Sequence, residues 1–200
     1  MTAEGHLVVA LASVIFAKRA ALTPVLAQGD WWHLLPAALL SGLLPDIDHP
    51  HSFLGQRLWW ISRPVARLFG HRGFTHSLLA VAGAIVLLWL QPPCSQVPAD
   101  VLQGMVIGYL SHLAADMLTP AGVPLLWPCR WRFCLPLLNS RHGNQRERGL
   151  GIALVICALW FPVNASPAAA ARHWSAQLIA IGQRGYQRPG QGWECGEGRK

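Results

Sequence analysis

The sequence predicts an all-α integral membrane protein, a helical bundle of about four helices. Two observations support this prediction. Hydrophobic residues make up 52% of the 200-residue chain and charged residues only 12%, whereas a soluble domain averages about 25% charged residues. The mean hydropathy is +0.32. Apolar stretches of helical length also recur along the chain, with short basic loops between them, as is typical of membrane bundles.

The first apolar stretch comprises residues 7–17 and is closed by Lys18 and Arg19. Eleven helical residues extend about 16 Å, roughly half of a bilayer core of about 30 Å. The stretch therefore either continues through residue 27, with the two bases facing protein or water, or forms a short buried helix. The sequence leaves both alternatives open.

Later stretches predict the other helices and the domain organisation. Residues 58–69 suit a short amphipathic helix at the membrane interface, and residues 123–138, with three prolines, predict an irregular segment. We expect one membrane-embedded domain over residues 1–163 and a weakly ordered tail over residues 164–200. The remaining apolar stretches, each a candidate helix, are residues 34–44, 78–90, 101–118 and 149–163.

The charge distribution predicts the orientation of the bundle. The chain carries a formal charge of +7, and its bases gather in residues 49–72 and 130–148, while residues 91–100 contain no Lys or Arg. By the positive-inside rule the two basic segments face the cytoplasm. Nucleic-acid binding is a weaker explanation, because the bases form no dense polar face. The five cysteines are odd in number and irregularly spaced, so we expect free thiols.

Two carboxylates stand at the end of the apolar stretch 34–44. Asp46 and Asp48 are two of only nine acidic residues, and neighbouring desolvated carboxylates repel one another unless a cation or proton intervenes. Together with His49 they offer hard oxygen ligands and an imidazole, which are metal ligands. The alternative is that the two acids cap a helix or pair with nearby arginines.

His112 and Asp116 lie inside the apolar stretch 101–118. Because they are four residues apart on a predicted helix, their side chains share one face. This spacing can present two metal ligands, and ionisable residues in membrane segments are functional by default. The alternative is a hydrogen bond that satisfies two buried polar groups.

His71 and His76 flank the predicted start of the helix 78–90, with Arg72 and Gly73 between them. Glycine allows an unusual backbone conformation or the close approach of a ligand. Two histidines at this place could hold a metal, or bind an anion with the help of Arg72 and the helix dipole. An interfacial basic loop is the third alternative. His6, before the first apolar stretch, is a weak candidate by itself.

Counted together without His6, the candidates use a third of the acids and a third of the histidines, which favours a metal site over any single pair. The predicted topology places all of them near the cytoplasmic face of the membrane. The set comprises His6, Asp46, Asp48, His71, His76, His112 and Asp116.

The chain resembles the YdjM-like family of LexA-regulated, membrane-bound, metal-dependent hydrolases of the bacterial inner membrane. The resemblance covers residues 1–163, and it rests on three segments in order: LPDIDH at 44–49, HRGFTHS at 71–77 and GYLSHLAAD at 108–116. His6 suits the family's N-terminal histidine. More distantly, the order of ligands looks like that of zinc-dependent phospholipase C and P1-type nucleases. Asp116 stands where those enzymes have a glutamate, and their further downstream histidine ligands have no clear match here.

The resemblance, taken with the residues, implies a multi-pass inner-membrane hydrolase of the SOS response that acts on a phosphoester in a lipid or another membrane-proximal substrate. The expected cofactor is a divalent metal, zinc first and manganese or magnesium second. The expected partners are membrane lipid and an anionic substrate, without nucleic acid. In this interpretation Asp48 orients or deprotonates the attacking water and Arg72 holds the anionic group. The metal ligands are Asp46, His71, His112 and Asp116, completed by His6 and His76.

A second class of function suits the same residues. Intramembrane His and Asp residues also occur in proton or ion pathways, and a metal can staple a scaffold that has no enzymatic activity. Stoichiometric metal separates these possibilities in part, because a proton relay needs none.

Overall fold

The computed structural model describes residues 1–70, 72–90, 97–129, 131–135, 137 and 143–163. Within these residues the chain is helical, and its extended structure is an isolated antiparallel bridge between Val123 and Phe133. The all-α prediction is therefore confirmed. The predicted tail, residues 164–200, lies outside the described residues.

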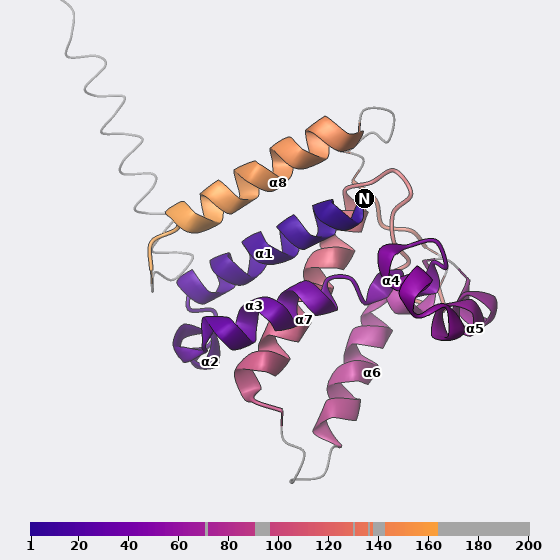
Figure 1. The fold of residues 1–200 in the computed structure, drawn as a ribbon, viewed down its shortest axis with the longest axis horizontal. Helices are drawn as coiled ribbons and strands as arrows, with labels where there is room; N and C mark the ends of the chain where they lie inside the picture. The colour runs from indigo at the N-terminus through magenta and orange to yellow at the C-terminus, as the bar shows by residue number, and fades with distance from the viewer. Residues whose placement is uncertain (71, 91–96, 130, 136, 138–142, 164–200) are drawn as a thin grey trace, which may run out of the picture.

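The helices match the apolar stretches of the sequence (Figure 1). Each of the five stretches lies largely within one helix, and the predicted amphipathic helix over residues 58–69 is α5. The helix α8 begins six residues before its apolar stretch, so Arg146 and Arg148 are helical and not in a loop. The elements in chain order are α1 (Ala3–Arg19), α2 (Pro24–Gln28), α3 (Trp31–Ser41), the 3-10 helix η1 (Pro45–Asp48), α4 (Phe53–Arg57), α5 (Trp59–Phe69), the 3-10 helix η2 (Phe74–His76), α6 (Leu78–Trp89), α7 (Ala99–Met117) and α8 (Gly143–Trp160).

The first helix ends at Arg19, so its continuation through residue 27 as a single helix is wrong. Ala21 adopts a left-handed conformation with φ of 47°, which breaks the helix. The hydroxyl of Thr23 then accepts a hydrogen bond from the Leu26 amide and caps the start of α2. The side chain of Lys18 turns back and donates hydrogen bonds to main-chain carbonyls at the end of α2, including that of Leu26. Its ammonium group is therefore hydrogen-bonded within the protein.

The helices α3 and α7 cross at close range because small residues meet at the crossing. A Cβ atom on Gly108 of α7 would lie 2.1 Å from the carbonyl oxygen of Ala38 in α3, and one on Gly104 would lie 3.0 Å from that of Leu34. Val14 of α1 and Leu26 of α2 join Leu34 and Ala38 in the buried apolar core. In Figure 1, α1 lies between α8 and α3, with α7 crossing behind them.

Apolar side chains are also exposed on the outer faces of α6 and α8. Val86 and Leu87 of α6, and Leu159 of α8, are each more than half exposed. Among the helices that the structure describes, none combines the length and the apolar character needed to cross a membrane.

Candidate metal centre

Four segments that are far apart in the sequence bring their polar side chains to one place. The start of α1 contributes His6, η1 contributes Asp46, η2 contributes His76, and the last turns of α7 contribute His112 and Asp116. The start of α1, marked N in Figure 1, lies beside the end of α7. Each of these side chains is almost fully buried except Asp46, which is 20% exposed.

The ligand atoms of these residues lie close together. The Nε2 atoms of His76 and His112 are 3.3 Å apart. Nε2 of His76 lies 3.5 Å from Oδ2 of Asp116, and Nε2 of His112 lies 3.7 Å from Oδ1 of Asp46. Nε2 of His6 lies 3.4 Å from the other oxygen of Asp116. Two overlapping groups, each with ligand atoms within 4.8 Å of one another, share His112: His6, Asp46 and His112, and His76, His112 and Asp116.

His76 and His112 are the two central histidines of the cluster, and the Nδ1 atom of each faces a hydrogen-bond acceptor. Nδ1 of His112 lies 2.7 Å from the carbonyl oxygen of Gly42, and Nδ1 of His76 lies 3.1 Å from Oδ2 of Asp48. Each Nδ1 therefore carries a proton, which leaves the lone pair of Nε2 directed into the cluster. Metal-binding histidines typically make this outer hydrogen bond to a carboxylate or a backbone carbonyl.

The resulting cluster contains more hydrogen-bond acceptors than hydrogen-bond donors. Two imidazole lone pairs 3.3 Å apart repel one another unless a proton or a cation lies between them. Oδ2 of Asp116 lies 3.0 Å from Nη2 of Arg72, yet it has no well-directed hydrogen bond within the described part of the chain, and neither has Nδ1 of His6. Imidazole nitrogens and carboxylate oxygens are common ligands of Zn²⁺ and Mn²⁺, so these residues fit a bound divalent metal.

Cations already surround the carboxylate of Asp116. The amino group of Met1 lies 3.0 Å from its Oδ1, opposite Arg72 on Oδ2. Burial lowers the pKa of His76, but the neighbouring carboxylates of Asp116 and Asp48 outweigh it and raise that pKa from 6.5 to about 9. In the metal-free protein a proton on His76 thus supplies part of the charge that a metal would bring.

Asp48 lies behind the ring of His76. Its Oδ2 accepts hydrogen bonds from the Arg72 amide at 2.9 Å and from the Thr75 hydroxyl at 2.5 Å, in addition to facing Nδ1 of His76. The side chain is fully buried. These contacts suit an acid that fixes the orientation of His76, and they place Asp48 on the opposite side of that ring from His112.

Arg72 adopts a left-handed conformation, with φ of 55°, which turns its amide toward Asp48. Its Nη1 donates to the hydroxyl of Thr119 and the carbonyl of Gly122, both at 3.3 Å. The guanidinium therefore lies at the cluster and pairs with Asp116. His71, predicted as a ligand, lies outside the described residues, so that prediction stays untested.

Three supporting groups were missed from the sequence. The carbonyl of Gly42 orients His112 directly. The side chain of Thr75 donates a hydrogen bond to Asp48 and so orients His76 through that acid. The hydroxyl of Tyr109 donates to the carbonyl of Thr75 and ties η2 to α7. Thr75 and Tyr109 both fall within the family motifs, so their positions carried a signal, whereas a backbone carbonyl leaves no trace in the sequence.

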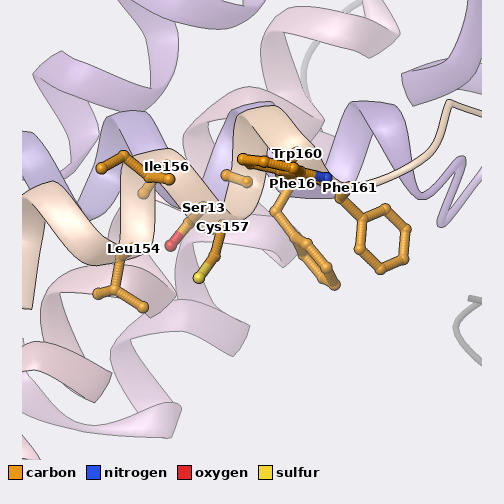
Figure 2. A pocket seen from close by; sticks show the side chains of 9 residues that line it. Ser13, Phe16, Leu154, Ile156, Cys157, Trp160 and Phe161 are labelled. Atoms are coloured by element: carbon orange, nitrogen blue, oxygen red, sulfur yellow. The ribbon is translucent and has the colours of Figure 1, made fainter. Parts of the chain in front are cut away.

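A separate apolar cavity of about 590 Å³ lies between α1 and α8 (Figure 2). Phe16 and Ser13 of α1 face Cys157 and Trp160 of α8, and Phe161 lies at its end. The five residues of the metal cluster do not line it. The cavity is therefore distinct from the candidate metal centre.

The fold and the cluster together define a class of protein: a small helical protein with apolar outer faces and a buried histidine–carboxylate centre suited to a divalent metal. The chain belongs to the family described as YdjM inner membrane protein, whose sequence model matches residues 1–171. The family resemblance predicted from the three motifs is therefore confirmed.

The curated relatives agree with this assignment. Proteins named inner membrane protein YdjM, from Escherichia coli (strain K12) and Shigella flexneri, are each 63% identical over 180 residues, which cover 90% of this chain and 91% of theirs. YvsG of Bacillus subtilis (strain 168) is 33% identical over 123 residues, 61% of this chain and 74% of its own. No solved structure matches the chain.

Proposed function

We propose that the protein is a metal-dependent hydrolase of the bacterial inner membrane that acts on a phosphoester, in a lipid or another membrane-proximal substrate. The observation that carries the proposal is that imidazole and carboxylate acceptors gather in two overlapping groups that share His112. The Nδ1 atoms of His76 and His112 are held by Asp48 and by the Gly42 carbonyl. A divalent metal bound there would supply a water of lowered pKa and polarise a phosphoryl oxygen.

The chain's own residues have separate parts in this proposal. Asp46 is the carboxylate of the cluster that solvent reaches, so it accepts the proton of the attacking water. Asp48, which the sequence interpretation assigned to the water, instead positions His76. Arg72 keeps its predicted part of holding an anionic group, because its guanidinium lies at the cluster.

Membrane residence is supported by the exposed apolar faces of α6 and α8, since soluble monomers rarely expose large contiguous apolar patches. The relatives named inner membrane proteins add to this support. We propose a multi-pass arrangement with residues 49–72 and 130–148 in the cytoplasm. In intact cells on a cysteine-free background, Gln96→Cys should react with an impermeant thiol reagent and Val65→Cys should not. The reverse result would invert the topology.

The hydrolase is tested with the purified full-length protein, supplied with zinc or manganese and assayed for release of phosphate or headgroup from phospholipids and nucleotides. Asp46→Asn should lower turnover by about 100-fold or more, as loss of a general base does, while Asp100→Asn, at the far end of α7, should not change it. A metal-loaded protein that is inactive on the whole panel would count against this substrate class.

A metal-stapled scaffold is the second candidate, because a specific observation favours it. His6, His76, His112 and Asp116 are each at most 1% exposed, and four protein ligands are what a structural zinc needs. A coordination spectrum with four protein ligands and no water would establish the scaffold. A protein that folds without stoichiometric metal would instead favour a proton or ion pathway.

Regulation by LexA in the SOS response is part of the proposal and rests on the family resemblance alone. A rise in the transcript after DNA damage, abolished in a strain with non-cleavable LexA, would test it.

A further inference from the structure

The helices α4 and α5 present an aromatic and basic surface beside the metal centre. Residues exposed on α5 form two adjoining rows at i, i+4 spacing, which on a helix lie side by side along its length. One row is apolar and comprises Trp60, Pro64 and Leu68. The other comprises Trp59, Arg63 and Arg67. We call these two rows, with Phe53 and Arg57 of α4, the α4–α5 surface.

The apolar row protrudes and is not packed into the fold. Trp60 is 61% exposed and Leu68 is 77% exposed. On the opposite side of the same helix Ser62 is fully buried, and this inner side packs toward η1. The helix is therefore held by one face while its aromatic and aliphatic face remains uncovered in the monomer.

The basic groups of the surface are held over aromatic rings. The guanidinium carbon of Arg63 lies 5.2 Å from the ring centre of Trp59, and that of Arg57 lies 4.8 Å from the ring centre of Phe53. Such cation–π contacts restrain the long side chains, so less entropy is lost when the guanidinium groups meet an anion. The sequence from residue 49 to residue 99 contains no acidic residue, so neither α4 nor α5 carries a carboxylate of its own that neutralises this charge.

From this surface we infer a partner: α4–α5 lies on the headgroup layer of an anionic lipid bilayer, with Trp60 and Leu68 inserted and Arg57, Arg63 and Arg67 paired with lipid phosphates. Tryptophan favours the membrane interface, arginine reaches from apolar surroundings to phosphates, and a helix with adjoining apolar and basic rows lies in the plane of the interface.

The position of this surface gives it a consequence for the metal centre. α5 packs against η1, which carries Asp46, the partly exposed member of the cluster. Docking of α5 on the headgroups therefore sets the centre at the depth of lipid phosphates. This inference depends on the membrane residence proposed above but not on hydrolysis, so its test reads lipid contact and not turnover.

The test uses the full-length protein on a cysteine-free background, reconstituted into discs of phosphatidylcholine alone or with added phosphatidylglycerol. A nitroxide is attached at Trp60→Cys, and its collisions with oxygen and with a water-soluble nickel chelate are compared. We expect the label to be shielded from the chelate in anionic discs and more exposed in neutral ones. A matched label at Trp32→Cys, another highly exposed tryptophan but one that follows Asp30, should not respond to lipid charge.

Charge variants decide whether the arginines are responsible. Removal of two charges in Arg63→Gln with Arg67→Gln should shift the population at position 60 about 30-fold toward the solvent-facing state, since each base near an anionic surface contributes about fivefold. Arg63→Lys with Arg67→Lys should retain the shielded state. A denaturant unfolding curve that matches that of the parent protein would show that the fold of each variant is intact.

Two outcomes would overturn the inference. Position 60 could be equally accessible to the chelate in neutral and anionic discs, or its response to anionic lipid could persist in the glutamine variant. A label shielded by added duplex DNA and indifferent to lipid charge would assign the surface to nucleic acid instead. If the lipid response holds but hydrolysis is absent, the surface stands and only the enzymatic proposal fails.

Discussion

Two histidine–aspartate pairs lie at the two ends of α7, and they differ in burial and in the groups around the carboxylate. We call His33 and Asp100 the outer pair, and His112 and Asp116 the inner pair. Near the start of α7, Asp100 lies 2.9 Å from Nδ1 of His33, and the side chains of His33 and Asp100 are 49% and 13% exposed. Near its end, His112 and Asp116 are 3.8 Å apart and at most 1% exposed. Both pairs join an imidazole to a carboxylate, so residue type alone does not separate them.

The environment of each carboxylate makes the difference. Oδ2 of Asp100 accepts a hydrogen bond from the backbone amide of Asp30 as well as facing His33, and water can reach the pair. Asp116 is buried with three histidines around it and a second carboxylate, Asp46, in the same cluster. A buried charge is costly unless it is paired, so Asp116 depends on the cations around it, Arg72 and the Met1 amino group, whereas Asp100 is partly solvated.

Removal of the inner carboxylate should have the largest effect. Asp116→Asn leaves Arg72 and the amino group of Met1 without their anion, and breaking one partner of a buried ion pair costs about 3–5 kcal/mol. We expect the purified variant to lose its metal and to unfold at lower denaturant concentration, measured by elemental analysis and by an unfolding curve. Asp100→Asn, the matched change at the outer pair, should retain metal. Equal metal content in the two variants would remove the distinction between the pairs.

A change in the helix crossing should come next. Gly108→Ala places a Cβ atom 2.1 Å from the carbonyl oxygen of Ala38, so α3 and α7 must separate, at a cost of about 1–3 kcal/mol of unfolding free energy. Because the same crossing brings Gly42 to His112, the apparent metal affinity should fall as well. Gly149→Ala, in α8, meets no atom within 4 Å and serves as the control. A Gly108 variant as stable as the control would contradict the close approach.

Asp48→Asn separates the two roles considered for this acid. If Asp48 orients His76, metal affinity should fall by about 10–100-fold, as for other groups that support a metal ligand. If it acts only on the water, the variant should keep its metal and lose turnover. Metal titration of the purified variants measures this directly. Ser62→Ala, which removes a buried hydroxyl with no hydrogen-bond partner among the described residues, should bind metal like the parent protein.

The smallest effect is expected at the outer pair itself. His33→Ala removes one hydrogen bond between groups that solvent reaches, and solvent screening leaves such pairs with little effect on stability. The unfolding curve should shift only slightly and metal content should not change. A loss of metal in His33→Ala would mean that the two ends of α7 are coupled and that exposure does not separate them.

Much of the fold and of the cluster follows from the sequence because both depend on local patterns. Apolar stretches of helical length predicted α1, α3, α6, α7 and α8, and the shortage of acids in an apolar chain made Asp46 and Asp116 conspicuous. The i, i+4 spacing placed His112 and Asp116 on one face of a helix. The family motifs identified the family, since three short segments in a fixed order are seldom matched by chance.

Other features depended on contacts between distant segments. The left-handed turn at Ala21 decided between two alternatives that the apolar pattern left open, and the early start of α8 went against the expectation of a loop. The Gly42 carbonyl meets His112 across 70 positions of sequence, and Asp48 meets His76 across 28. These two contacts depend on the crossing of α3 and α7 and on the placement of η1 against η2. Local propensity acts over a few residues, so the sequence by itself determined where the main helices lie and which side chains are candidate metal ligands. Only the packed structure decided which atom of each side chain faces the centre, because that depends on contacts between distant segments.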